Sequence, residues 1–109
     1  MGFKLAKSET FRVNNITIET TDDKGRVQKD TVSAVYKRPN EDRLDALDGK
    51  KNCDVCREML VTVEGMLDDD NQPVPYEGDN IEALLSIPPA TFALAAAFWQ
   101  GARLGRTKN

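Results

Sequence analysis

The stretch TFRVNNITIETT, residues 10–21, decides the fold of this chain. Its apolar side chains stand at odd positions before the pair Asn14-Asn15 and at even positions after it. Each half therefore alternates with period two, which is the pattern of a half-buried β-strand. A change of phase within one strand predicts a β-bulge that re-aims the side chains after it. We therefore expect one long, bulged strand at residues 10–21.

A second strand pairs with the first in this interpretation. Gly25 supplies the left-handed conformation that a tight turn between them needs. Residues 27–38 then alternate again until Pro39, which lacks the backbone N–H that a sheet requires. The shared face of this strand consists of Val32, Ala34 and Tyr36. Residues 1–39 are thus predicted to form a β-hairpin.

The next part of the chain carries helical signals. Asn40 is placed to cap a helix that stops at Gly49, and Asn52 is placed to cap a second helix that stops at Gly65. One face of this second helix would consist of Val55, Met59, Leu60 and Val63. Residues 60–63 also have strand character, because valine favours strands. A strand therefore stays open as an alternative there.

An acidic, proline-containing loop is predicted at residues 66–78. It lies within residues 64–82, which contain seven carboxylates and no Lys or Arg, a local charge of −7. The EF-hand calcium loop needs glycine at its sixth position, but counting from Asp68 that position is Pro73, which cannot make the same turn. We therefore predict a solvated loop and no calcium site.

Two helices complete the chain. Asp79 and Glu82 have the spacing of an N-capping box, which predicts a short helix through Leu85. Prolines stop that helix, and the last helix is predicted from about Pro89 to Leu104. A basic tail follows it.

The order of the elements predicts the fold class. Two strands followed by about four helices are typical of an α+β protein. A chain of 109 residues has room for one modest core. We therefore expect a single small domain, residues 1–109, with a hairpin part at 1–39 and a helical part at 40–109.

The composition argues against several functions. A net charge of −3 does not suit binding to nucleic-acid phosphates. No apolar run approaches the ~18 residues of a membrane span, and residues 1–6 lack the apolar core of a secretory signal. The expected location is therefore the cytoplasm, where cysteines stay reduced. The chain contains no histidine, which removes the Ser-His-Asp and Cys-His nucleophile systems. We expect neither an enzyme nor a bound cofactor.

The sharpest local motif is Cys53-Asp54-Val55-Cys56. A CxxC pair is half of a structural zinc site or a dithiol redox centre. Zinc needs four ligands, and the chain offers two thiols and no histidine. A redox pair belongs at a helix N-terminus in a βαβ unit, whereas the strands here indicate a hairpin. Two reduced cysteines without a special role are the leading interpretation, and a small thiol-redox or zinc-binding module is the alternative.

The last helix is apolar on two sides. Phe92 and Trp99 lie on one stripe, and Leu94 and Phe98 lie on another. Such a helix buries both sides in its own domain or meets another chain, and the sequence favours neither explanation. Its alanines permit the close approach of another helix. Our hypothesis assigns partner or self contacts to Phe92, Leu94, Phe98 and Trp99.

Several motifs follow one another in a specific order from Val63 onward. They are Val63-Glu64-Gly65 before the acidic turn, Gln72-Pro73-Val74-Pro75-Tyr76, Asp79-Asn80-Ile81-Glu82-Ala83-Leu84-Leu85 and the alanine-rich last helix with Lys108-Asn109 at the end. This order resembles that of the tail assembly chaperones of long-tailed phages. The similarity extends over nearly the whole chain, from Phe3-Lys4-Leu5 onward. Met66 departs from the tryptophan that family members often have, and the CxxC is not part of their pattern.

The resemblance implies a function without catalytic residues. Members of the family bind the tape measure protein during tail assembly, keep it soluble, recruit tail tube subunits and are absent from the finished particle. The expected partners are therefore the tape measure protein, the tail tube protein and further copies of this chain. The expected location is the cytoplasm of the bacterial host.

Overall fold

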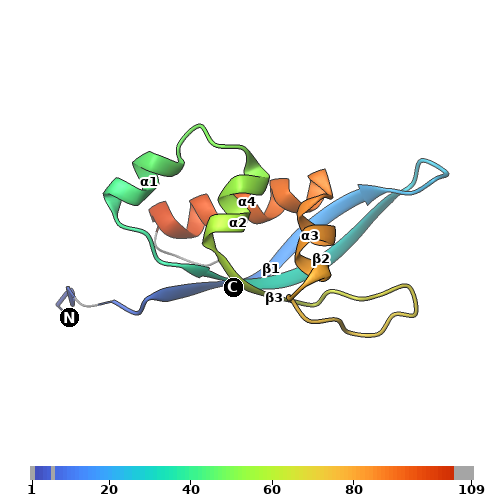
Figure 1. Ribbon diagram of the computed structural model, residues 1–109, viewed down its shortest axis with the longest axis horizontal. Coiled ribbons are helices and arrows are strands. Elements are labelled where there is room, and N and C mark those ends of the chain that lie inside the picture. The colour runs from blue at the N-terminus through green and yellow to red at the C-terminus, as the bar shows by residue number, and fades with distance from the viewer. Residues whose placement is uncertain (1, 6, 105–109) are drawn as a thin grey trace.

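The chain folds into a three-stranded antiparallel sheet with helices packed on it (Figure 1). The computed structural model describes residues 2–5 and 7–104, so the predicted basic tail, residues 103–109, lies outside the described residues from position 105 onward. In chain order the elements are β1 (Thr10–Thr21), β2 (Val27–Lys37), α1 (Glu41–Leu47), α2 (Asn52–Met59), β3 (Leu60–Glu64), α3 (Asp79–Leu85) and α4 (Pro88–Leu104). The predicted α+β class is confirmed.

The hairpin of β1 and β2 contains the predicted bulge. The register between the two strands shifts between Val13 and Ile16. Asn15 has a φ of 58°, in the left-handed region that asparagine tolerates better than most residues. The shift brings Ile16 and Ile18 onto the buried side of β1. Gly25 adopts a φ of 80° in the turn, as its place in the sequence predicts.

Residues 60–63 form a strand and not the end of the second helix. α2 ends at Met59, and β3 pairs antiparallel to β2, with Thr62 opposite Val35. The sheet order is therefore β1-β2-β3. The predicted helix up to Gly65 is wrong in this part, because the open edge of β2 offers backbone partners to a segment that favours strands.

The helix caps agree with prediction only in part. The Oδ1 atom of Asn40 accepts a hydrogen bond from the backbone N–H of Arg43 at 2.8 Å and so caps α1 as expected. Asn52 and Asp79 are instead the first residues inside α2 and α3, and neither helix has a side-chain cap. Gly78 takes the cap position of α3 with a φ of 55°, which glycine adopts without strain. The predicted capping box is therefore wrong.

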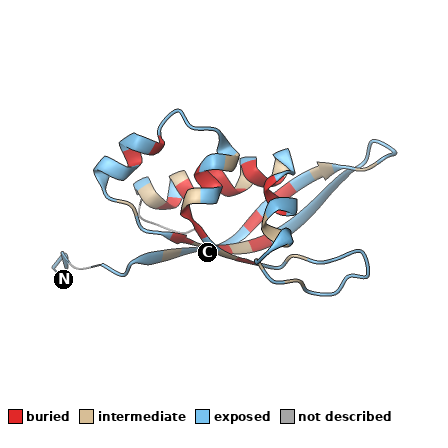
Figure 2. Ribbon diagram, viewed as in Figure 1, coloured by how far each residue is buried: buried red, intermediate tan, exposed pale blue. Residues whose placement is uncertain are grey.

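An aromatic cluster fixes α4 to the sheet. Tyr36 of β2 and Phe98 of α4 are fully buried, with ring centres 5.5 Å apart. Phe11 of β1 stacks on Tyr36 at 5.3 Å. The hydroxyl of Tyr36 donates to the carbonyl oxygen of Leu94 at 2.7 Å, and burial raises the pKa of Tyr36 above its ordinary value. Figure 2 shows the buried residues gathered where α2 and α4 meet the sheet.

The acidic loop at 66–78 is shaped by its own hydrogen bonds. The Oδ1 atom of Asp68 accepts from the backbone N–H groups of Asp70 and Gln72, at 2.9 and 3.0 Å. An aspartate that binds backbone groups a few residues ahead is typical of turns. This carboxylate oxygen therefore closes the turn.

Candidate functional site

The CxxC pair lies on α2 and does not form an exposed dithiol. Cys56 is buried, and its Sγ donates to the carbonyl oxygen of Thr91 in α4 at 3.7 Å, whereas Cys53 is only half-buried. Burial, with a smaller contribution from Cys53, raises the pKa of the Cys56 thiol to about 12. The thiolate is the form that attacks disulfides and binds metals. A thiol that stays protonated at neutral pH suits neither role, and Cys56 packs in the core instead.

Among the described residues, the surroundings of the cysteines do not complete a metal site. In the part of the chain that the structure describes, no three Cys, His, Asp or Glu side chains are grouped so that they could hold a metal ion. The geometry therefore lends no support to the zinc or thiol-redox alternative.

A thiol titration tests the placement of the two cysteines. At mildly alkaline pH, we expect an aromatic disulfide reagent to modify Cys53 readily and Cys56 far more slowly, because Cys56 is buried and a pKa of about 12 leaves very little of its thiol as thiolate. Denaturant should make both thiols reactive. The variant Cys53→Ser isolates the slow thiol. Two equally fast thiols in the native protein would contradict the burial of Cys56 and favour the dithiol alternative again.

The four residues assigned to partner contacts fall into two groups. Leu94 and Phe98 are fully buried among the core residues. Their assignment to a partner surface is therefore corrected, because they pack inside the chain itself. Phe92 is 67% exposed and Trp99 is half-buried, so this stripe remains available to another chain. The sequence does not distinguish the two stripes because both are apolar.

Phe92, Ala96 and Trp99 form a strip that we refer to as the α4 ridge. Their spacing of four and three residues places them on one side of the helix, and Phe92 and Ala96 are exposed to solvent. Trp99 lies edge-on to Phe98, with ring centres 5.3 Å apart. The guanidinium of Arg103 lies 4.8 Å from the centre of the Trp99 ring. The ridge is thus an apolar strip with a positive charge at its C-terminal end.

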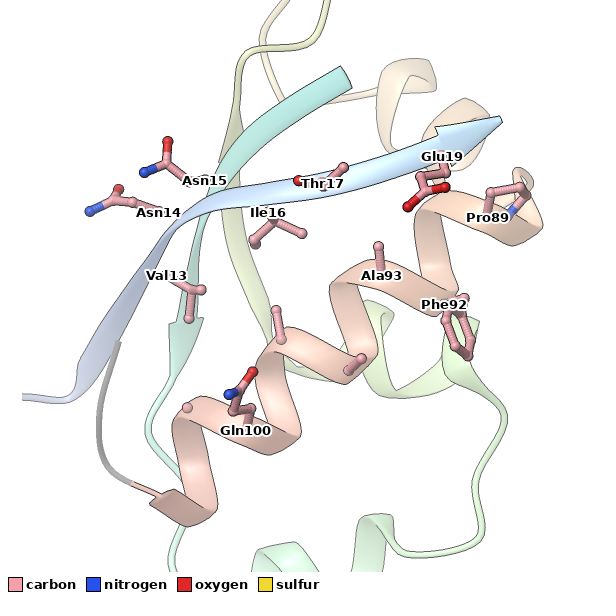
Figure 3. A pocket seen from close by; sticks show the side chains of 13 residues that line it. Val13, Asn14, Asn15, Ile16, Thr17, Glu19, Pro89, Phe92, Ala93 and Gln100 are labelled. Atoms are coloured by element: carbon pink, nitrogen blue, oxygen red, sulfur yellow. The ribbon is translucent and has the colours of Figure 1, made fainter. Parts of the chain in front are cut away.

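Beside the ridge, α4 and β1 flank an open groove of about 600 Å³, which we refer to as the β1–α4 groove (Figure 3). Its α4 wall consists of small residues with one exposed ring, and its β1 wall is largely polar. The lining residues are Val13, Asn14, Asn15, Ile16, Thr17, Glu19, Pro89, Phe92, Ala93, Ala96, Ala97, Gln100 and Gly101. At Gly101 the helix approaches the strand so closely that a Cβ would lie 2.6 Å from the ring of Phe11. Gly101 thus permits the close approach at this end of the groove, and the small alanine side chains leave the rest of it open.

The strand wall of the groove is an edge of the sheet. Within the described residues β1 pairs with β2 alone, so its other side has no strand neighbour. The backbone groups on such an edge can pair with a further extended segment. Sequence reasoning missed this groove, although the alanines and the glycine of the last helix are a signal for it. Those small residues predict that another element approaches α4 closely, but they do not show that β1 is the element that forms the other wall of the groove.

No single helix of the described region is long and apolar enough to cross a bilayer. α3 and α4 meet the length and composition requirements only when taken together, and they meet at a bend of 89°.

The ridge and the groove are therefore interpreted from their own geometry and from the sequence motifs. No protein-family model, curated protein or solved structure gives a significant match to this chain.

Proposed function

We propose that this chain is a phage tail assembly chaperone. It binds the tape measure protein in the cytoplasm of the bacterial host, keeps it soluble, helps to recruit tail tube subunits and is left out of the finished particle. The ordered motifs from Val63 onward support the family, and the α4 ridge supplies a binding surface. The proposal gives no residue a catalytic role.

The observation that carries the proposal is the uncovered apolar ridge. Phe92 is largely exposed, and it stands in line with Ala96 and Trp99 on a helix that buries Leu94 and Phe98 in the core. Contiguous exposed apolar surface is typical of interaction sites, and aromatic residues are enriched at their centres. A long helical partner that is apolar on one side can lay that side along the ridge. Covering the partner in this way keeps it soluble.

Self-association of the chain extends this surface. A single ridge is short compared with a long partner, so one contact would be weak. Several copies held together present several ridges to the same partner, which raises the overall affinity without any new contact. The proposal therefore includes a homo-oligomer.

Co-expression with the tape measure protein of the same phage tests the proposal. We expect the wild-type chain to move most of the tape measure protein into the soluble fraction. The double variant Phe92→Ser with Trp99→Ala should lose most of this effect, because it removes both aromatic contacts from the ridge. The matched control is Val27→Ser with Leu67→Ser, which alters two exposed apolar residues on other elements and should behave as wild type.

The outcomes separate the function from the surface assigned to it. A wild-type chain that leaves the tape measure protein insoluble contradicts the proposed function. A folded double variant that still solubilises the partner leaves the function standing but rejects the ridge. Thermal unfolding of the purified variants shows that any loss is not a loss of folding.

A further inference from the structure

The N-terminal arm, residues 2–5 and 7–9, lies outside the regular elements and exposes apolar side chains. Phe3 is 80% exposed and Leu5 is 92% exposed. The contact made by the ring of Phe3 in the described chain is with the ammonium of Lys7, 4.0 Å from the ring centre. Figure 1 shows the arm reaching past the end of the sheet and away from the helices. Two large apolar side chains two residues apart are thus left without a core.

We infer that the arm of one copy lies in the β1–α4 groove of a second copy and pairs with the free edge of β1. Phe3 and Leu5 have the spacing that puts both on one face of a strand. That face meets the small-residue wall formed by Ala93 and Ala97, where the groove has room for large side chains. The backbone of the arm at the same time supplies a neighbour for the edge strand.

The charges of the two surfaces are complementary. Lys4 and Lys7 make the arm basic. Glu19 is the charged residue among those that line the groove. Figure 3 shows its carboxylate directed toward the Pro89 end of α4, at one end of the groove. A basic and apolar arm therefore fits this groove better than an acidic segment does.

The geometry of the chain favours a second copy over the arm's own groove. The carbonyl oxygen of Ser8 accepts from the Nε of Arg38 at 2.8 Å, and the carbonyl oxygen of Glu9 accepts from the backbone N–H of Arg38 at 2.8 Å. These bonds hold the arm in line with β1, so it leaves the sheet pointing away from the groove beside residues 13–19. To enter its own groove the arm would have to reverse direction and break them.

This contact deepens the proposed function, since it explains the self-association that the chaperone needs, and in that respect rests on it. Each copy offers one arm and one groove at different places on its surface. Such a contact is either exchanged between two copies or repeated from copy to copy, in which case it builds a ring or an open filament. Phe92 and Ala96 line the groove as well as forming the ridge, so a filled groove covers their groove side, whereas Trp99 does not line the groove.

Two variants that each remove one side of the contact test the inference on the purified chain alone. Phe3→Ser with Leu5→Ser removes the apolar side chains of the arm, and Ala97→Arg fills the groove. We expect the wild-type chain to associate with rising concentration in sedimentation velocity, and each variant to stay monomeric over the same range. Leu67→Ser, an exposed apolar residue of the acidic loop, is the matched control and should associate as wild type.

Mixing the two variants is the decisive step. The Ala97→Arg chain still has an intact arm and the arm variant still has an intact groove, so the mixture should form a one-to-one heterodimer although neither chain associates alone. No heterodimer, or a wild-type chain that is monomeric at every concentration, would overturn the inference. Association of the arm variant as in wild type would also overturn it and place self-association on another face. If Ala97→Arg does not fold, Ala93→Lys fills the same wall and takes its place.

The same measurement keeps the inference separate from the proposed function. No tape measure protein is present in it, so a monomeric wild type rejects the arm contact but leaves binding to the tape measure protein to be judged by co-expression. Conversely, a chain that associates through its arm and fails to solubilise the tape measure protein rejects the proposed function alone.

Discussion

Replacing Phe98 with alanine is expected to lower the free energy of unfolding by about 3–5 kcal/mol, the usual range for a buried phenylalanine. The ring is fully buried, and its centre lies 5.5 Å from that of Tyr36 and 6.0 Å from that of Phe11. Its removal leaves a cavity between α4 and the sheet, where the rings of both strands lose a neighbour. Chemical denaturation followed by far-UV circular dichroism measures the loss. The whole free energy of unfolding of a native protein is only about 5–15 kcal/mol, so this variant should be close to the limit of folding.

Phe92→Ala is the matched control for this effect. It makes the same chemical change on the same helix, but the side chain is largely exposed, so the change in stability should stay within about 0.5 kcal/mol. If Phe98→Ala is too unstable to measure, Phe98→Leu keeps part of the volume and should lie between the two. Equal, small effects at both positions would mean that α4 does not pack on the sheet through Phe98.

The difference between these two residues marks how far the sequence could predict the candidate site. The helical spacing of α4 shows two apolar stripes, but it does not show which one faces the core. That choice depends on where the sheet lies, and the ring of Tyr36 in β2 is far from Phe98 in the sequence. The groove was missed for the same reason, since its two walls are distant in sequence and meet only in the folded chain.

The fold was easier to predict where the signal is local. The period-two pattern and its change of phase at Asn14-Asn15 define β1 and its bulge, because the alternation of side chains is a property of the strand itself. No local pattern of this kind marks the end of α2 at Met59. Residues 60–63 fit a helix by spacing and a strand by composition, and only the free edge of β2 decides between them. The cap of α3 was misplaced by one residue because glycine at position 78 adopts the required backbone without a side-chain bond.

The second large effect is expected at Gly101, where α4 crosses β1. In an ordinary helix interior, alanine in place of glycine stabilises by about 0.8–1 kcal/mol. Here the added Cβ would lie 2.6 Å from Cε2 of Phe11 and 3.3 Å from Cγ2 of Val13. The ring of Phe11 cannot move away freely, because it stacks on Tyr36 at 5.3 Å. Overpacking of this kind costs about 1–3 kcal/mol. We therefore expect Gly101→Ala to lower the free energy of unfolding, as measured by chemical denaturation.

A double-mutant cycle with Phe11→Leu shows whether this contact is the cause. Leucine lacks the ring atom that the new Cβ would meet, so Gly101→Ala should become neutral or stabilising by up to about 1 kcal/mol in that background. The sign of the substitution would then reverse between the two backgrounds, which a general effect on the helix cannot produce. Gln100→Ala, an exposed neighbour in the same turn, serves as the control and should leave stability nearly unchanged in both. If Gly101→Ala stabilises the wild-type chain, α4 can move away from β1, and the narrow end of the groove is not fixed by the glycine.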